Sequence, residues 1–228
     1  MVRTAWQFFN EVSVDRTSRI RIGTHDDMKF RHHRAPYYRA LQWKPVEMDE
    51  LIKPAVQVFL TQQAFIRICA HAGSDLHNEV GGWLAGKAYL DNQTGKPFIV
   101  INTVLPAEFT EHGSAFLTFT QDSQVRMHAT LTDDYPDLRL LGWFHTHPKM
   151  GVFFSEWDRW LHENFFPEPW QVGLVIEPYS AAAGFFQKQV NGKLDTRCYF
   201  GFNELYHRRR RSIVHWRNLV PVENIQEE

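Results

Sequence analysis

Apolar residues fall into short runs along this chain, and the spacing within each run predicts the element that it forms. Alternating or continuously apolar runs predict strands at residues 56–60, 80–89, 98–104, 116–120, 138–144, 171–176, 181–190 and 196–202. Apolar residues spaced three to four apart predict amphipathic helices at residues 62–72 and 121–132. This order of elements predicts an α+β or α/β fold, with helices flanking a mixed sheet.

Clusters of turn-forming residues separate these runs. Residues 91–97 contain Asp, Asn, Gly and Pro, and they predict a turn that joins strands 80–89 and 98–104 into a hairpin. The Asn-Gly pair at 191–192 predicts a second hairpin. Residues 111–114 predict a loop ahead of the strand at 116–120.

Two histidines follow the apolar run at residues 138–144. His145 and His147 are two residues apart, and Pro148 stops the strand because it has no N–H for a ladder. Side chains alternate along a strand, so both imidazoles are expected on the same side of the sheet. In that arrangement they can close on one metal ion.

A helix is expected shortly after the histidines. Ser155 is placed as its N-cap, and Asp158 falls in its first turn, pointing back towards the strand end. Two histidines and one aspartate make a three-ligand set of the kind that holds catalytic zinc, with water in the fourth position. Alternatively, His162, which shares the helical face of Asp158, serves as a fourth ligand and makes the zinc structural.

This stretch resembles the JAMM motif of MPN-domain metalloproteases, which consists of a distant Glu, His-Ser/Thr-His-Pro and a later Ser-x-x-Asp. The matching positions here are His145, Thr146, His147, Pro148, Ser155 and Asp158. For the distant glutamate we nominate Glu79, because a Gly-rich apolar strand follows it, as is typical of the family. The resemblance extends over about residues 55–190 and is specific at the motif.

The resemblance implies the MPN fold, an α+β, cytidine-deaminase-like domain in which helices flank a curved mixed β-sheet. On this basis we expect a JAMM/MPN catalytic domain at residues 55–202, an N-terminal extension at 1–54 and a C-terminal extension at 203–228. The compact chain with short inserts resembles prokaryotic members of the family more than subunits of eukaryotic complexes.

The family's activity implies a deubiquitinase-like zinc hydrolase, an isopeptidase or peptidase that cuts after the C-terminal Gly of ubiquitin or a ubiquitin-like modifier. The implied cofactor is Zn²⁺, held by His145, His147 and Asp158. Glu79 is the implied general acid/base, and the hydroxyl of Ser155 is placed to stabilise the oxyanion. The modifier's tail is expected to pair with a sheet edge, for which we nominate residues 114–120.

Composition sets the broad class of the protein. The chain has 228 residues, 43% hydrophobic and 22% charged, which is typical of a globular protein with a sizeable core. A formal net charge of −1 does not favour nucleic acid or a membrane as partner, and two cysteines do not make a disulfide framework. The first 19 residues lack the apolar core of a signal peptide, so we expect a cytoplasmic protein.

Several alternatives stay open at this point. The protein is alternatively a non-catalytic MPN scaffold, or a peptidase that trims precursor tails rather than conjugates. Residues 31–39, which mix Arg, His and Tyr, and the basic run at 207–211 alternatively indicate nucleic-acid binding by stacking and charge. Within the enzyme hypothesis, Glu108, Glu111 and Glu156 are rivals to Glu79 as the acid/base.

Overall fold

The computed structural model of the protein describes residues 30–47, 51–107, 110–113, 116–207 and 211–222. Its helices are α1 (Gln62–Ala72), α2 (Gln121–Asp133) and α3 (Glu156–Phe165), with a short 3-10 turn at Tyr37–Arg39. Its strands are β1 (Arg31–His33), β2 (Ala40–Pro45), β3 (Gln57–Thr61), β4 (Gly81–Asp91), β5 (Pro97–Pro106), β6 (Thr110–Gly113), β7 (Phe116–Phe119), β8 (Arg139–Thr146), β9 (Val172–Glu177), β10 (Ala182–Phe186), β11 (Phe202–Leu205) and β12 (Leu219–Val222).

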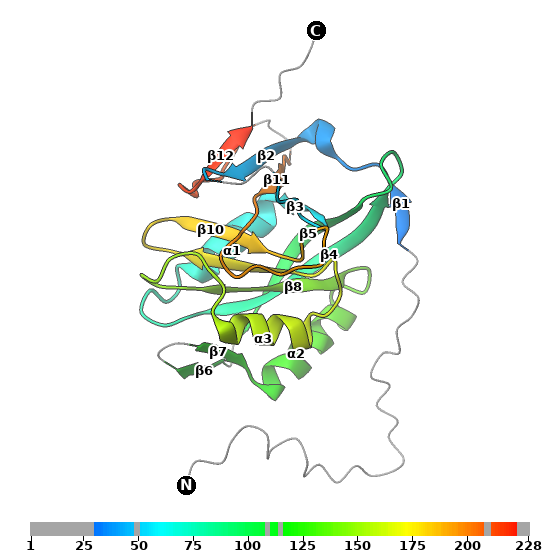
Figure 1. The fold of residues 1–228 in the computed structure, drawn as a ribbon. Helices are drawn as coiled ribbons and strands as arrows, with labels where there is room; N and C mark the ends of the chain where they lie inside the picture. The colour runs from blue at the N-terminus through cyan, green and yellow to red at the C-terminus, as the bar shows by residue number, and fades with distance from the viewer. Residues whose placement is uncertain (1–29, 48–50, 108–109, 114–115, 208–210, 223–228) are drawn as a thin grey trace, which may run out of the picture.

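One large mixed sheet organises the described residues (Figure 1). Its strand order is β10-β9-β8-β4-β5-β3-β11-β2-β12, and β1 pairs with β4 outside this path. The pairs β8–β9, β3–β5, β3–β11 and β1–β4 are parallel, whereas β4 pairs antiparallel with both β5 and β8. The fold is therefore α+β with a mixed sheet and flanking helices, as the sequence predicts.

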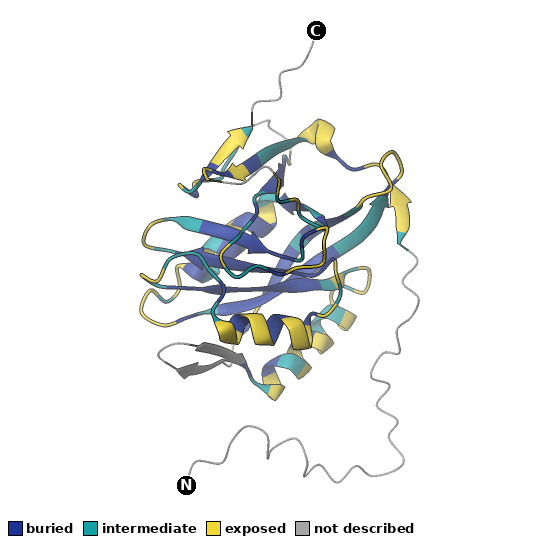
Figure 2. Cartoon of the chain, viewed as in Figure 1, coloured by how far each residue is buried: buried dark blue, intermediate teal, exposed yellow. Residues whose placement is uncertain are grey.

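The two faces of the sheet carry separate apolar cores. Helix α1 buries Phe65 and Ile68 in a cluster that includes Leu84 of β4. Helix α3 buries Leu161 in another cluster that includes Trp83, the neighbour of Leu84. Adjacent strand residues point to opposite faces, so α1 covers one face, and α2 and α3 lie on the other. Figure 2 shows the central strands as the most continuously buried part of the chain.

The helices predicted at 62–72 and 121–132 are confirmed, and capping residues mark their ends. Helix α1 begins after Thr61, whose side chain accepts the N–H of Ala64, and ends at Gly73. Helix α2 begins after Thr120, whose side chain accepts the N–H of Ser123. None of the helices among the described residues has both the length and the apolarity needed to cross a membrane.

Two local predictions are wrong. Residues 111–114 were expected to form a loop, but residues 110–113 form β6, which pairs antiparallel with β7. The strand expected at 196–202 is absent except for Phe202, the first residue of β11, because the chain between β10 and β11 makes only isolated bridges. The physical reason is a turn at Asp195, which accepts the N–H of Arg197, and a Tyr199 ring packed directly against the Cα of Gly184.

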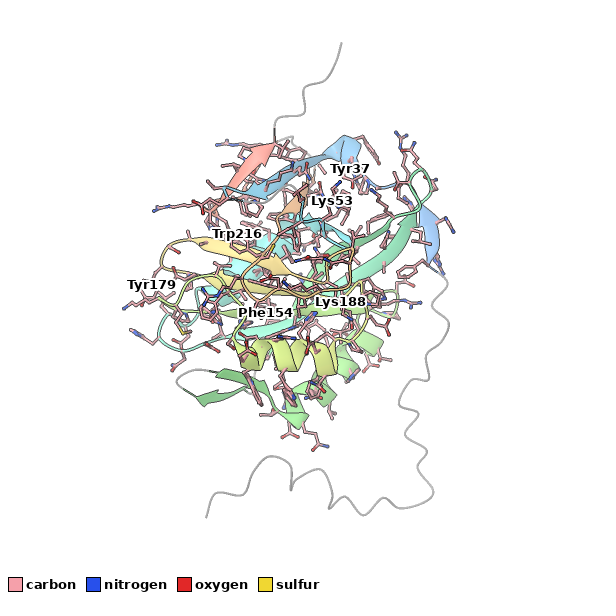
Figure 3. The ribbon with its side chains drawn as sticks, in the orientation of Figure 1. Tyr37, Lys53, Phe154, Tyr179, Lys188 and Trp216 are labelled. Carbon is pink, nitrogen blue, oxygen red and sulfur yellow. The ribbon has the colours of Figure 1, made fainter. Side chains whose placement is uncertain are left out.

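Segments from both ends of the chain complete the sheet. Strands β2 and β12 pair with each other, and β11 lies between β2 and β3. Trp216, labelled in Figure 3, packs against the rings of Phe65 and Phe202. Residues that the sequence analysis assigned to the extensions thus contribute strands and core to the same sheet. The limits of 55 and 202 for a catalytic unit stay a prediction.

Candidate metal centre

Strand β8 brings both histidines to the same point. The strand is paired with β4 on one side and β9 on the other. Beyond its last residue the N–H of His147 donates to the carbonyl of Ile176 at 2.8 Å, which keeps the backbone aligned with β9. His145 and His147 are both buried, and their Nε2 atoms lie 2.9 Å apart. The prediction that the two imidazoles share one side is confirmed.

Helix α3 supplies the carboxylate through its N-terminal cap. The Ser155 hydroxyl oxygen accepts the N–H of Asp158 at 3.1 Å, and Asp158 Oδ2 accepts both the N–H and the O–H of Ser155 at 2.7 Å. This reciprocal capping box occupies Oδ2. Asp158 Oδ1 remains directed at His145, 3.3 Å from its Nε2. The cap therefore orients the carboxylate towards the histidines.

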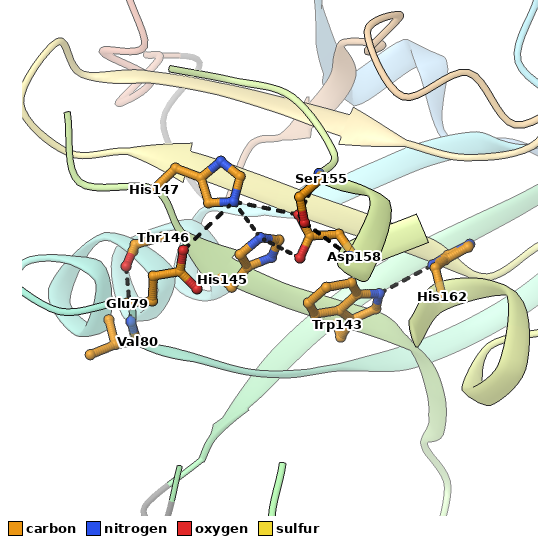
Figure 4. Close-up of polar contacts among 9 residues, drawn as sticks. All are labelled: Glu79, Val80, Trp143, His145, Thr146, His147, Ser155, Asp158 and His162. Carbon is orange, nitrogen blue, oxygen red and sulfur yellow. Dashed lines mark hydrogen bonds and ion pairs between the residues drawn. The ribbon is translucent and has the colours of Figure 1, made fainter. Parts of the chain in front are cut away.

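The three side chains form a buried group that fits a metal ion (Figure 4). One ligand atom from each of His145, His147 and Asp158 lies within 4.8 Å of the others. Two imidazole nitrogens and one carboxylate oxygen are a donor set that zinc takes in catalytic sites. Burial raises the pKa of Asp158, but His145 and the hydrogen bonds to its carboxylate outweigh burial and hold the pKa well below its ordinary value.

Glu79 lies beside this group, immediately before β4. Its side chain is 8% exposed, and its Oε1 is 3.9 Å from His147 Nε2. Its Oε2 has no hydrogen-bond partner among the described residues. Burial raises the pKa of Glu79 to about 7, His147 opposes the rise and Asp158 adds to it. Such a carboxyl group is poised to exchange a proton at neutral pH.

Thr146 of β8 forms two hydrogen bonds with the segment that carries Glu79, a role that the sequence alone did not indicate. Its N–H donates to the Val80 carbonyl at 2.8 Å, and its hydroxyl oxygen accepts the Val80 N–H at 2.9 Å. The pair of hydrogen bonds fixes the residue next to Glu79 relative to the two histidines. The only signal in the sequence for this role is the hydroxyl residue between the two histidines.

The rival residues take other positions. Glu156 is exposed on α3, whereas Glu108 and the side chain of Glu111 lie outside what the structure describes. His162 is not part of the metal group, because its ring lies beyond the indole of Trp143, whose N–H donates to His162 Nδ1 at 3.1 Å (Figure 4). The four-ligand alternative is therefore wrong for this geometry.

The other nominated surfaces are only partly described. Within residues 31–39, the Tyr37 ring packs on Phe59 with centroids 5.1 Å apart, whereas Tyr38 is 68% exposed. Residues 208–210 of the basic run and residues 114–115 of the nominated edge lie outside the described chain. The described part of that edge is β7, which pairs with β6.

Comparisons with known proteins give one family match and two curated relatives. Residues 54–166 match the family model described as JAB1/Mov34/MPN/PAD-1 ubiquitin protease. The chain is 29% identical over 154 residues to COP9 signalosome complex subunit 5 of Dictyostelium discoideum, covering 67% of this chain and 44% of that protein. Over 69 residues it is 32% identical to the NAD(+) hydrolase TcpA of a Theionarchaea archaeon, covering 30% of this chain and 21% of that protein.

The chain thus spans less than half the length of these curated relatives. A solution structure of a protein from Desulfitobacterium hafniense aligns with a TM-score of 0.45 and 22% identity, covering 62% of this chain and 92% of that one. The matched segment 54–166 contains Glu79, both histidines and Asp158. The segment at residues 54–166 therefore carries a JAB/MPN domain, of the family that the JAMM-like motif indicates.

Proposed function

We propose that the protein is a zinc-dependent isopeptidase or peptidase that cleaves after the C-terminal Gly of ubiquitin or a ubiquitin-like modifier. One observation carries the proposal: three buried ligand atoms converge within 4.8 Å, and a carboxyl group with a pKa raised to about 7 lies beside them. A structural site has no need for such a carboxyl group, whereas hydrolysis of an amide needs a group that takes up and releases a proton.

The residues have distinct parts in this reaction. Zinc, when bound by His145, His147 and Asp158, lowers the pKa of water and polarises a carbonyl group. Glu79 accepts the proton that the attacking water loses, and its unpartnered Oε2 is the atom available for it. The same carboxyl group then delivers the proton to the leaving amine.

Ser155 is proposed to act through Asp158 first. Its hydroxyl donates a hydrogen bond to Asp158 Oδ2 at 2.7 Å, so the same O–H is not available to another acceptor. Donation to an oxyanion, the role implied by the family, requires the hydroxyl to leave this bond. A Ser155→Ala variant separates the two roles, because loss of carboxylate orientation lowers zinc affinity, whereas loss of oxyanion stabilisation lowers turnover with zinc affinity unchanged.

The substrate class is supported by the family match and by the kind of bond that the site suits. The matching family model is described as a ubiquitin protease. The ligand side chains are buried, and a glycine at the end of a tail has no side chain to clash on the way to them. An extended tail pairs well with a strand, and β7 remains the nominated partner.

Metal content and cleavage test the proposal together. Purified protein is analysed for zinc by mass spectrometry beside His147→Ala and beside His128→Ala, a control that removes an exposed histidine of α2. We expect about one zinc per chain in the wild type and the control, and loss in His147→Ala. The three proteins are then incubated with reporter fusions of ubiquitin and ubiquitin-like proteins.

Cleavage by the wild type and the control, with no cleavage by His147→Ala, is the expected result. Absence of zinc from reconstituted wild-type protein overturns the enzyme proposal and favours the scaffold alternative. Zinc binding without cleavage of any fusion overturns the substrate assignment but leaves the metal site in place.

A further inference from the structure

The two ligand histidines lack the hydrogen bond that usually orients a metal-binding imidazole. In most sites the ring nitrogen that does not bind the metal donates to a carboxylate, carbonyl or water, which fixes the ring. Here Nδ1 of His145 and Nδ1 of His147 are buried and have no partner within the described chain. No protein group among the described residues therefore orients either ring through Nδ1.

For His145 the neighbouring surface is an indole ring. Trp143 lies two residues earlier on β8, on the same side of the strand. Its ring is parallel to the imidazole of His145, with an interplanar angle of 7° and centroids 4.6 Å apart. Trp143 is itself fully buried, stacked on Phe166 at 6.1 Å and tilted against Phe154 at 5.7 Å. The imidazole of His145 thus packs face to face on a buried indole ring.

The indole is held at its far end by the helix that carries the third ligand. The N–H of Trp143 donates to Nδ1 of His162 at 3.1 Å, and both side chains are buried. His162 follows Asp158 by four residues, so the two side chains project from the same face of α3. The strand and the helix are therefore connected twice, by His145 with Asp158 at 3.3 Å and by Trp143 with His162.

We infer that Trp143 and His162 are positioning residues for the metal group, acting through their hydrogen bond and through the stacking of Trp143 on His145. The bond fixes the spacing between β8 and α3, and hence between the histidine pair and Asp158. The stacked indole replaces the hydrogen bond that His145 lacks at Nδ1. This inference rests on the proposed function, because it assigns the two residues to the same zinc site.

The protonation state of His162 is consistent with this role. Burial, and to a smaller extent the charge of Lys188, lowers the pKa of His162 to about 4. The ring is therefore neutral at physiological pH, and Nδ1 is free to accept the indole proton. Phe154 and Phe166 pack against the His162 ring with centroids 5.8 and 5.9 Å away, which leaves the ring little freedom to turn.

Zinc affinity of purified protein tests the inference without any substrate. His162→Gln keeps an acceptor for the indole, whereas His162→Leu removes it at similar size; Trp143→Phe keeps a ring against His145 but removes the N–H. Competition with a chelator is expected to show affinity lowered about 10- to 100-fold in His162→Leu and Trp143→Phe, as for other outer partners of metal ligands. His162→Gln is expected to restore affinity close to the wild-type value.

A destabilised but unrelated variant provides the control. Ile68→Ala removes a buried side chain of α1 on the other face of the sheet and is expected to lower the melting temperature with no change in zinc affinity. The visible absorption of Co²⁺-substituted protein supplies a second readout, and its bands are expected to shift in His162→Leu but not in Ile68→Ala.

The outcomes separate this inference from the proposed function. If the wild type binds zinc and His162→Leu binds it equally well with unchanged Co²⁺ bands, the positioning role is refuted and the metal site stands. Equal losses in His162→Gln and His162→Leu refute the role of the hydrogen bond. If the wild type binds no zinc, the proposed function fails and this inference fails with it.

Discussion

Two buried glutamates in this protein have opposite surroundings. Glu204 of β11 is fully buried; its Oε1 accepts from Gln62 Nε2 at 2.8 Å and from the Ile213 N–H at 3.0 Å, and its Oε2 accepts from Trp43 Nε1 at 3.2 Å. Glu79 is nearly as buried, but its Oε2 has no partner among the described residues and its Oε1 faces His147 at 3.9 Å.

The difference shows that the supply of hydrogen-bond donors, more than burial, distinguishes Glu204 from Glu79, the proposed acid/base. Three donors surround Glu204, so the side chain ties β11 to α1, to β2 and to the segment that leads into β12. Glu79 lacks such donors, and its pKa is raised to about 7 because burial is not compensated. Substitution of Glu79 is therefore expected to lower turnover, whereas substitution of Glu204 is expected to lower stability.

The largest expected effect is on turnover at Glu79. Glu79→Gln removes the proton acceptor while keeping size, and a general acid/base contributes about 10²- to 10⁴-fold to rate, so turnover of a cleavable fusion is expected to fall by that amount. Zinc content and melting temperature are expected to stay near wild type. The exposed Glu156→Gln is the matched control on α3. Activity that survives in Glu79→Gln assigns the acid/base to another residue.

The next effect is on stability at Glu204. Glu204→Leu leaves Trp43 Nε1 and the Ile213 N–H without their acceptor. It also removes one of the two acceptors of Gln62 Nε2, which still donates to the Arg211 carbonyl at 2.8 Å. An unsatisfied buried donor costs about 1–3 kcal/mol. We expect the free energy of unfolding in urea to fall by about 3 kcal/mol or more. Zinc affinity of the folded fraction is expected to be unchanged. A variant as stable as the wild type contradicts the structural role given to these hydrogen bonds.

A smaller effect on stability and turnover is expected at Thr146, which connects the segment of Glu79 to β8. Thr146→Val keeps the shape but removes the acceptor of the Val80 N–H, at a cost of about 1–2 kcal/mol in unfolding free energy. Turnover is expected to fall while zinc content is kept, because Glu79 is less well fixed. Thr146→Ser, which retains the hydroxyl, is the matched control. Unchanged turnover in the valine variant removes Thr146 from the positioning role.

A further effect is a pH dependence of stability. The pKa of Glu79 is raised in the folded protein from 4.5 to about 7, so the folded state binds more protons than the unfolded state between these values. Its contribution to stability is present below pH 4.5 and is lost as the pH rises through about 7. The metal-free wild type is expected to lose stability over this interval relative to metal-free Glu79→Gln, in urea titrations at each pH. Parallel curves contradict the raised pKa.

Local signals in the sequence were sufficient for much of the fold and the metal ligands. Helix α1 has the predicted bounds because its cap, its apolar period and Gly73 all lie within a few neighbouring residues. His145, His147 and Asp158 were predictable because a strand with period two and a capped helix fix side-chain directions locally. Glu79 was nominated from the family resemblance, and its separation from the histidines in sequence gives no geometric signal.

Long-range pairing was not predictable from the chain. Strand β2 pairs with β11 and β12, which follow it by more than 150 residues, and no local pattern in these short strands indicates such partners. The Trp143–His162 hydrogen bond also joins a strand to a helix across an intervening loop. In the sequence, His162 is marked only by sharing a helical face with Asp158. That position does not distinguish a metal ligand from a residue that positions a ligand.

The capping box at Ser155 has a consequence for the order in which the protein matures. Asp158 is oriented by hydrogen bonds within its own helix, and the histidines are oriented by a strand paired on both sides. We therefore expect the candidate ligands to reach their positions without the ion, unlike those of zinc fingers, which need the ion to fold. On the proposed function, protein synthesised in zinc-depleted medium should accumulate in a folded but inactive form, and zinc added later should activate it without refolding.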